Sequence, residues 1–421
     1  MKDRVSRQIA AFGLVAVVFF GATLGAVDGA LASQKRSRAE QSPPNPLEET
    51  APDPLLPEKP KNGMLPPEER DRLRTALDEL NVKAAAELAG GNTQEAFEIW
   101  NRELRLRRYL GPLEEIEALA RVGAVAWNKQ LLTQVQIIAQ RLEEIQIEYC
   151  SSFVSNPSSR GVYRCDLEML QALAKAYQAV VERSLAVAVY EEILANARNR
   201  QDMPARQATL KTIARLQLER LDYPGAAVAY EELLALAEAS SDRSVEISYV
   251  LELARVYARG RQFEQAIAMR QRLVQFYTDT EELRRVPELQ LAIASDYQTL
   301  GRDNKALPHL RAAYKLAWSL QQFYLARVAL EQIGSIYSSR DRLAEALQVY
   351  QALLIVDRRA YNLYGMMNTY DQIGQIYKRR QDYPQALAAF QKGLDLARQL
   401  GYRTDYFAGQ IEQIVRVSSP E

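Results

Sequence analysis

Side chains that could form a metal site or a catalytic triad are scarce in this sequence. Its 421 residues include one histidine, His309, and two cysteines, Cys150 and Cys165. Zinc sites and histidine-dependent triads need several such side chains held together. His309 follows a proline in a helical stretch, where a packing or surface position is commoner than a general base. We therefore expect no catalytic residue, no metal site and no cofactor.

Adjacent carboxylates offer another chemistry, acid–base hydrolysis. Glu191 and Glu192 form one such pair, and Glu231 and Glu232 form another. Neighbouring side chains on a helix point about 100° apart, so both pairs are better explained as solvated helix faces. The sequence also lacks glycine-rich phosphate loops, the Gly-x-Ser-x-Gly elbow and the His-Glu-x-x-His zinc motif. These observations predict that the protein is not an enzyme.

Composition narrows the class of partner. The chain is 48% apolar and carries 53 Lys and Arg against 53 Asp and Glu, so its formal net charge is zero. A general nucleic-acid binder needs surplus cations to displace counterions from phosphates. We therefore expect no nucleic-acid partner. At about 150 residues per domain, length alone would suggest two or three domains.

The N-terminus, residues 1–32, has the layout of a secretory signal. Basic residues precede an apolar run over 9–27, and Ala30-Leu31-Ala32 provides a small-residue cleavage site. We expect cleavage after Ala32 and an extracytoplasmic location, in the periplasm or a comparable lumen. The run approaches the length of a membrane-spanning helix, so an uncleaved signal anchor is the alternative.

Proline content marks the next segment. Residues 33–67 hold nine of the seventeen prolines. Because proline lacks a backbone donor and fixes φ, we expect a disordered, extended tether here. Long amphipathic helical stretches follow over 68–402, and a final helix and tail occupy 403–421.

An internal repeat with a period of 40 residues decides the fold class. A small residue recurs in six successive segments, at Ala186, Ala226, Ala266, Ala306, Ala346 and Ala386. A tyrosine stands nine residues earlier in five of the six, preceded by an aliphatic–small pair such as Leu253-Ala254. Each unit is expected to be a helical hairpin, whose small residues allow close backbone approach. One hairpin cannot bury its apolar stripe alone, so the hairpins must stack.

These units resemble the tetratricopeptide repeats, with aliphatic-Gly/Ala-x-x-Tyr in the first helix and Ala-x-x-x-Phe/Tyr in the second. The 40-residue period is similar to that of kinesin light chains. The resemblance covers residues 166–400, and two divergent units precede it, one near Ala96 and Trp100 and one near Val122 and Val135. It implies an all-α, right-handed superhelical solenoid of about eight hairpins with a C-terminal cap helix.

The repeat register breaks once, within residues 150–165, where two cysteines bracket an insertion. In an oxidising compartment Cys150 and Cys165 should pair, closing a loop worth about 3 kcal/mol in the chain-entropy model. The alternative is two buried thiols that never meet. The disulfide-closed loop either contacts a partner or only holds a long connector together, and we favour the second interpretation because it requires no ligand.

The resemblance also implies a binding groove lined by the first helix of each hairpin. Its outward positions hold five cations in three successive units: Lys175, Lys211, Arg215, Arg255 and Arg259. The cations suggest an acidic protein or peptide, but surface charge neutralised by residues such as Glu168, Glu219 and Glu252 explains them equally well. The asparagines that chaperone-binding relatives use are replaced by Lys175 and Arg215. Later units contribute polar candidates, Gln298, Asn368 and Lys378.

We predict an exported scaffold or adaptor that binds a protein or peptide in this groove and assists assembly of an envelope or lumenal complex. The alternative is a self-assembling structural envelope protein, with Trp100 and Trp127 at the interface between copies. A hydrolase or a small-ligand sensor is disfavoured because no nucleophile, base and orienting group come together in the sequence. Membrane contact is expected if the signal stays uncleaved.

Overall fold

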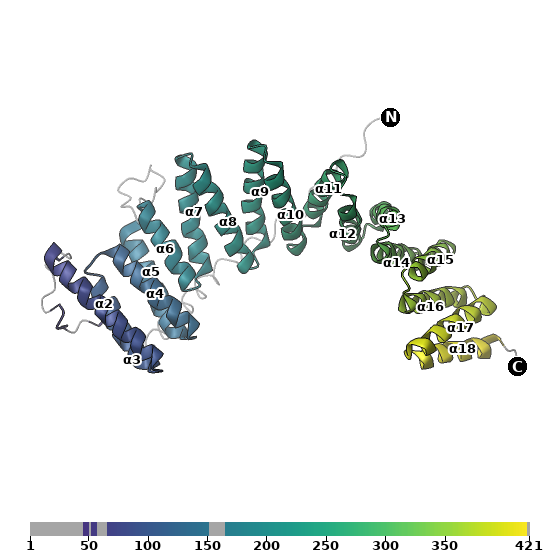
Figure 1. Ribbon diagram of the computed structural model, residues 1–421, viewed down its shortest axis with the longest axis horizontal. Helices are drawn as coiled ribbons and strands as arrows, with labels where there is room; N and C mark the ends of the chain where they lie inside the picture. The colour runs from purple at the N-terminus through teal and green to yellow at the C-terminus, as the bar shows by residue number, and fades with distance from the viewer. Residues whose placement is uncertain (1–44, 50–51, 57–64, 151–164, 419–421) are drawn as a thin grey trace, which may run out of the picture. The chain divides into compact units, whose positions relative to one another are not determined.

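The computed structural model describes residues 45–49, 52–56, 65–150 and 165–418 (Figure 1). The signal expected over 1–32 and the interior of the insertion lie outside these residues. The described part of the chain contains seventeen α-helices, one short 3₁₀ helix and no β-strand, apart from an isolated bridge between Asp53 and Leu56. No helix within these ranges is long and apolar enough to cross a bilayer.

The chain divides into two compact units, residues 1–182 and 183–421. The first unit contains α2 (Pro67–Ala89), α3 (Thr93–Arg107), α4 (Pro112–Asn128), α5 (Leu132–Cys150) and α6 (Leu167–Ala179). The second unit contains α7 (Arg183–Asn199), α8 (Met203–Glu219), α9 (Tyr223–Ala239), α10 (Arg243–Arg259), α11 (Phe263–Asp279), η1 (Leu283–Arg285), α12 (Val286–Thr299), α13 (Asp303–Ser319), α14 (Phe323–Ser339), α15 (Leu343–Arg359), α16 (Leu363–Arg379), α17 (Tyr383–Leu400) and α18 (Thr404–Ser418).

The helices of the second unit are separated by turns that recur every 20 residues. One residue of each turn has a left-handed backbone, with φ between 54° and 69°. These residues are Gln201, Leu221, Ser241, Arg261, Glu281, Gly301, Gln321, Asp341, Tyr361, Gln381 and Gly401. The following amide then reaches back into the helix that is ending; Asp222 N, for example, donates to Gln217 O at 2.8 Å. Two equal helices with equal turns produce the 40-residue period.

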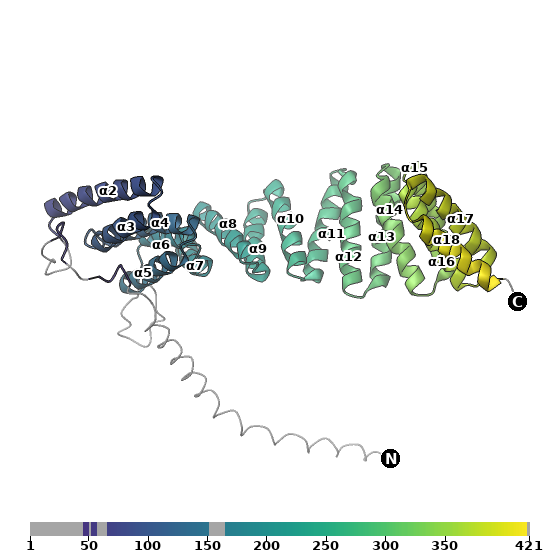
Figure 2. The same cartoon turned by 90° about the horizontal axis from the view of Figure 1, so that it is seen from below.

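Paired helices confirm the hairpins expected from the repeat (Figure 2). The six recurring alanines lie in α7, α9, α11, α13, α15 and α17, one in each, and all six are 0% exposed. Seven consecutive pairs are in contact within one unit: α2/α3 and α4/α5 in the first unit, and α8/α9, α10/α11, α12/α13, α14/α15 and α16/α17 in the second, while α6 ends the first unit and α7 begins the second. α18 then packs on α17 through Phe407, which is fully buried. The all-α hairpin fold and its cap helix are confirmed, and the superhelical hand stays a prediction.

The described part of the proline-rich segment differs from the extended tether expected over 33–67. Leu47, Leu56 and Leu65 are 2%, 8% and 7% exposed. Leu56 and Leu65 belong to the apolar core of the first hairpin, together with Leu73 and Leu106. Proline restricts the backbone of this segment, but it does not prevent the leucines beside it from being buried.

The two tryptophans considered for a self-assembly interface occupy different environments. Trp100 is 3% exposed inside the first hairpin, and its Nε1 donates to Asn81 Oδ1 at 3.0 Å. Trp127 is 42% exposed on α4. An interface role for Trp100 is therefore wrong, because its ring already packs within the chain, in edge contact with Phe97.

Candidate peptide-binding face

The first helix of each hairpin, here called the A helix, exposes one row of side chains in the second unit. On α8 this row includes Lys211, Arg215 and Glu219, and on α10 it includes Arg255 and Arg259. Residues three or four apart share a face of a helix, which explains the row. Four of the five cations predicted from the sequence therefore lie exposed on neighbouring hairpins of one unit.

Arg215 and Arg255 occupy equivalent positions, 40 residues apart, and each pairs with a carboxylate of its own helix. Arg215 Nη1 lies 2.5 Å from Glu219 Oε1, and Arg255 Nη1 lies 3.1 Å from Glu252 Oε1. Their side chains are 52% and 69% exposed. Exposed pairs of this kind contribute about 0.2–1 kcal/mol. A ligand carboxylate can therefore replace the intrahelical partner at small cost.

Glu219 keeps its charge on this row because two arginines surround it. A hydrogen bond from Arg183 of α7, 3.0 Å long, lowers the pKa of Glu219 below its ordinary value, and Arg215 lowers it further against the opposing effect of burial. The row is therefore partly neutralised at α8.

Arg259 has a different role. Its guanidinium lies 5.2 Å from the ring centroid of Tyr223, the first residue of the preceding hairpin's second helix. Ion pairs join the same edges at other steps of the second unit: Arg183–Glu219, Arg302–Glu264, Arg340–Asp303 and Arg379–Asp341. We call these contacts the turn ladder. Arg259 belongs to this ladder and stabilises the stack.

Lys175 is exposed on α6 and belongs to the first unit. The aliphatic–small pair that precedes it, Leu173 and Ala174, is fully buried. Its outward position is therefore as expected from the repeat. The structure brings the remaining cations together on the second unit, at α8 and α10.

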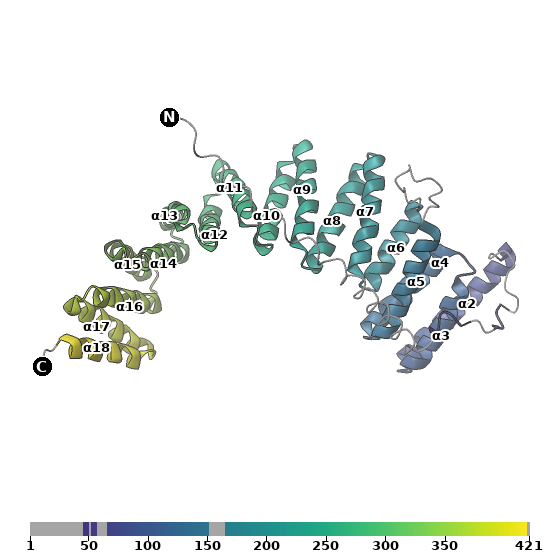
Figure 3. The same cartoon turned by 180° about the vertical axis from the view of Figure 1, so that it is seen from behind.

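The polar candidates of the later units are partly covered. Asn368 Oδ1 accepts from Arg403 Nη1 at 3.1 Å, and Lys378 Nζ donates to Gln410 and Gln413 of α18 at 3.2 and 2.9 Å. Figure 3 shows α16, α17 and α18 in that order at the C-terminal end of the second unit. Gln298 is half-buried on α12. The cap helix thus occupies the last hairpin, where the sequence predicted an open polar groove.

A buried carboxylate anchors this cap, and the sequence interpretation missed its role. Asp371 is 6% exposed, and it accepts from Tyr406 Oη at 2.8 Å and from Arg403 Nη2 at 3.0 Å. The signal was present as a tyrosine and an arginine three residues apart at the start of α18. Arg403 and Tyr406 follow the last hairpin, so the 40-residue repeat gave no expectation for their positions.

His309 and the carboxylate pairs have structural partners. His309 Nδ1 lies 2.6 Å from Gln290 Oε1, its ring stacks on Tyr297, and burial lowers its pKa below the ordinary value. Glu231 accepts from Tyr257 Oη, and Glu232 accepts from Arg206 Nε at 2.6 Å. Glu231 therefore joins its hairpin to the next one, while Glu232 joins the two helices of its own hairpin.

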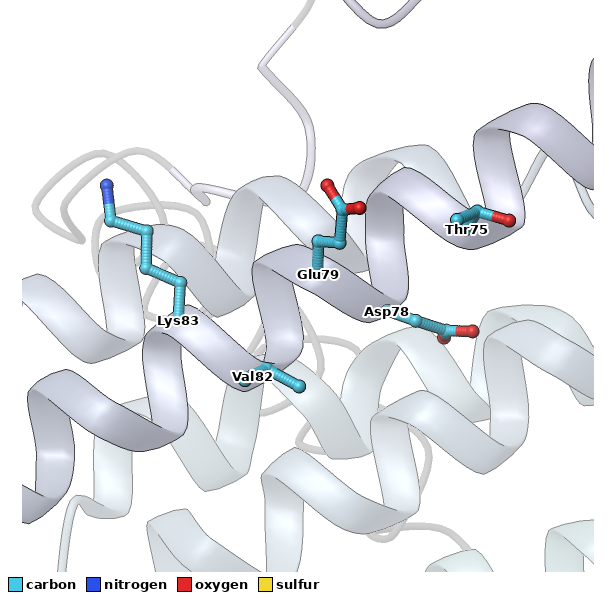
Figure 4. Close-up of a pocket in the computed structure, with 5 residues that line it drawn as sticks. All are labelled: Thr75, Asp78, Glu79, Val82 and Lys83. Atoms are coloured by element: carbon cyan, nitrogen blue, oxygen red, sulfur yellow. The ribbon is translucent and has the colours of Figure 1, made fainter.

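A shallow hollow lies along α2 in the first unit, lined by Thr75, Asp78, Glu79, Val82 and Lys83 (Figure 4). All five residues come from one helix, and Glu79 and Lys83 point to a different side of it from Asp78 and Val82. Val82 is 68% exposed. No polar groups converge here. Among the residues that the structure describes, no group of three His, Cys, Asp or Glu is placed to hold a metal ion.

Comparison with known proteins supports the repeat assignment. Residues 324–399 match the family model for the tetratricopeptide repeat. No curated protein sequence matches the chain. The matched segment covers α14 to α17, the two hairpins in which the recurring alanines are Ala346 and Ala386.

Several solved structures are similar at low identity. BtubC (BKLC) from P. vanneervenii is 16% identical, with 52% of this chain and 92% of that chain covered and a TM-score of 0.34. A putative kinesin light chain from Podosopora anserina with nearly identical TPR-like repeats is 22% identical, with 50% and 98% covered and a TM-score of 0.30. Aspartyl phosphate phosphatase F from Bacillus subtilis is 14% identical, with 72% and 78% covered and a TM-score of 0.36.

TM-scores in this range support no conclusion about function. The family assignment depends on the matched segment and on the recurrence of the same helix pair every 40 residues along the second unit. The chain thus contains tetratricopeptide repeats, which the family model identifies over residues 324–399.

Proposed function

We propose that the protein is an exported scaffold that binds an acidic, extended protein segment on the basic face formed by Lys211, Arg215 and Arg255. The observation that carries this proposal is the pairing of Arg215 and Arg255 at equivalent, exposed positions of α8 and α10, each with a carboxylate of its own helix. Other arginines of the unit join one hairpin to the next.

Geometry supports an extended occupant. Equivalent positions on successive A helices repeat with the hairpins, so a peptide crossing α8 and α10 would meet Arg215 on one helix and Arg255 on the next. Its carboxylates would replace Glu219 and Glu252 as partners, and rim charges of this kind chiefly improve association rate and specificity. Binding to a surface that is already formed involves no turnover of the partner. We therefore propose a non-enzymatic role, in an envelope or lumenal complex.

Export is supported by the sequence of residues 1–32 and by the cysteines. The structure joins Cys150, the last residue of α5, to Cys165 by a disulfide, with Cα atoms 4.5 Å apart. Disulfides persist in oxidising compartments. Mass spectrometry of the protein purified from its natural cells should show a chain that begins at Ser33. A chain that begins at Met1 and remains in the membrane fraction would support the signal-anchor alternative.

Selection from a random-peptide display library tests the binding proposal. Peptides selected on the full chain should be enriched in Asp and Glu, and their binding should weaken as salt is raised. The same selection on a chain carrying Lys211→Glu and Arg255→Glu should lose this enrichment. A selection that yields uncharged peptides, with no change in the double variant, would reject the basic face as the binding site.

A further inference from the structure

The first hairpin carries a second set of cations that the repeat pattern does not explain. Arg102, Arg105 and Arg108 follow one another at intervals of three residues along α3 and its C-terminal end, so they share one side of the helix. Burial lowers the pKa of Arg105, and neighbouring Arg108 lowers it further. Arginines so close together repel one another unless an acidic group lies between them.

The chain's own N-terminal residues supply that acidic group. Asp53 Oδ2 and Oδ1 accept from Arg102 Nε and Nη2 at 2.7 and 2.8 Å, a bidentate pair. Glu49 forms an ion pair with Arg105, and Arg108 Nη2 donates to the carbonyl of Leu47 at 2.7 Å. We call residues 45–49 and 52–56 the strap. Figure 1 shows its two short segments in dark purple near α2 and α3.

Leucines fix the strap on its other side. Leu47 is 2% exposed, and Leu56 is 8% exposed against the cluster that contains Leu73, Leu77 and Leu106. A fully buried leucine contributes about 1.5–3 kcal/mol relative to an exposed one. The strap therefore combines apolar anchors with charge pairs, as a bound peptide does.

The strap repeats one local motif. Asn45-Pro46-Leu47 and Asp53-Pro54-Leu55 each begin with a side chain whose Oδ1 accepts from the leucine amide two residues later, at 2.9 Å in both cases. Such a turn is preorganised by the proline and by its own hydrogen bond, so little conformational entropy is lost on docking. Acidic groups at Asp53 and Glu49 then face the arginines.

We propose that the first hairpin carries a binding site for acidic segments of the form Asn/Asp-Pro-Leu, and that the strap occupies this site in cis. The site is distinct from the basic face of the second unit. Because the strap is part of the same chain, its effective concentration is high, and a segment supplied by another molecule binds when the strap has been released. The strap thus keeps the site closed until a competing segment displaces it.

Opening the strap in the full-length protein tests this proposal. The Glu49→Arg/Asp53→Arg double variant should release it, and hydrogen exchange should show faster exchange of the Leu47, Leu55 and Leu56 amides while α2 and α3 stay protected. The Leu47→Ala/Leu56→Ala variant releases the strap without a change of charge, and it replaces the first variant should that one fail to fold. Lys83→Glu, on the exposed side of α2, is the charge-change control.

A fluorescent peptide with the sequence of residues 44–57 is the probe. It should bind both strap-released variants, with an affinity that weakens at higher salt, and it should not bind the wild type or the Lys83→Glu control. Adding Arg102→Glu should weaken binding by about tenfold or more, as expected for the loss of a charged bidentate hydrogen bond. A peptide with arginine in place of Asp53 should recover part of that loss.

Two results would overturn the proposal. Unchanged exchange of the strap amides in both released variants would mean that these contacts do not hold the strap. Faster exchange of the strap amides without binding of the peptide would mean that α3 does not form a binding site for such segments. Neither result would affect the basic face, which lies in the second unit.

Discussion

Gly374 and Phe390 approach each other across the hairpin of α16 and α17, so that a Cβ atom on Gly374 would lie 2.6 Å from Cε1 of Phe390. Gly334 and Tyr350 stand in the same relation one hairpin earlier, at 2.7 Å. In the hairpin before that, alanine stands in place of glycine and Leu310 in place of the ring. In these three hairpins the smaller residue stands opposite the larger side chain, whereas Ala214 and Tyr230 occupy the equivalent positions of α8 and α9.

Gly374→Ala should destabilise the second unit by about 1–3 kcal/mol, because the added methyl displaces a fully buried ring. Urea denaturation measures the loss. Combining it with Phe390→Leu, which restores the alanine–leucine pairing found at Leu310, should cost less than the sum of the two single changes. Gly409→Ala is the control, since a Cβ there meets nothing within 4 Å and alanine favours a helix by up to about 1 kcal/mol. Equal stability of the two alanine variants would contradict close packing at Gly374.

The left-handed turns give the second prediction. Leu221 has φ 60° and is 65% exposed, so its side chain gains little from burial while its backbone is strained. Leu221→Gly should raise the free energy of unfolding by about 1 kcal/mol. Gly301 occupies the same turn position with φ 69°, and Gly301→Ala should lower the free energy of unfolding by a similar amount. Thermal denaturation checks both, and shifts of the same sign would refute the turn interpretation.

These turns also show what the sequence could and could not predict. The small and aromatic residues at fixed spacing predicted the hairpins, because close packing restricts residue type. Turn positions such as Leu221 and Tyr361 carry no glycine signal, because the helices on both sides hold the backbone in place. The 20-residue spacing of the turns was therefore not visible from composition.

The candidate sites were predicted in part. The outward positions of Lys211, Arg215 and Arg255 were expected from the resemblance to the tetratricopeptide repeats, and the structure has them exposed. The contact of Arg259 with Tyr223 depends on the neighbouring hairpin, and so does the cover of Lys378 by α18. The strap was missed because its prolines suggested a tether, although leucines and acidic residues alternate with them.

Acid should weaken the second unit through Glu232. Burial would raise the pKa of Glu232, but hydrogen bonds from Arg198 and Arg206 outweigh burial and lower it. A carboxyl group whose pKa is lowered by folding stabilises the fold above its unfolded pKa, near 4.5, and this contribution is lost as pH falls further. Urea denaturation at several pH values should show a smaller acid dependence for Glu232→Gln. An unchanged pH profile would mean that the Arg198 and Arg206 contacts contribute no stability.

Reduction of the disulfide should affect the first unit selectively. Cys150 and Cys165 are separated by 15 residues, and closing such a loop contributes about 3 kcal/mol in the chain-entropy model. Reducing agent, or the Cys150→Ser/Cys165→Ser variant, should speed hydrogen exchange in α5 and α6. Exchange in α14 and α15 serves as the internal control and should not change. Two free thiols in the protein isolated without reductant would contradict a disulfide and remove this support for export.

The affinity of an acidic peptide obtained by display selection tests the proposed function most directly. Lys211→Glu/Arg255→Glu reverses two exposed charges on the basic face and leaves Arg215 in its contact with Glu219, so the fold is preserved. Arg358→Glu/Arg359→Glu makes the same change of net charge at the exposed end of α15. The account predicts that the first variant loses about tenfold or more in affinity, as expected for about 1.4 kcal/mol of charge contacts, and that the second binds like the wild type. Equal affinity of both variants for the peptide would contradict binding at the basic face.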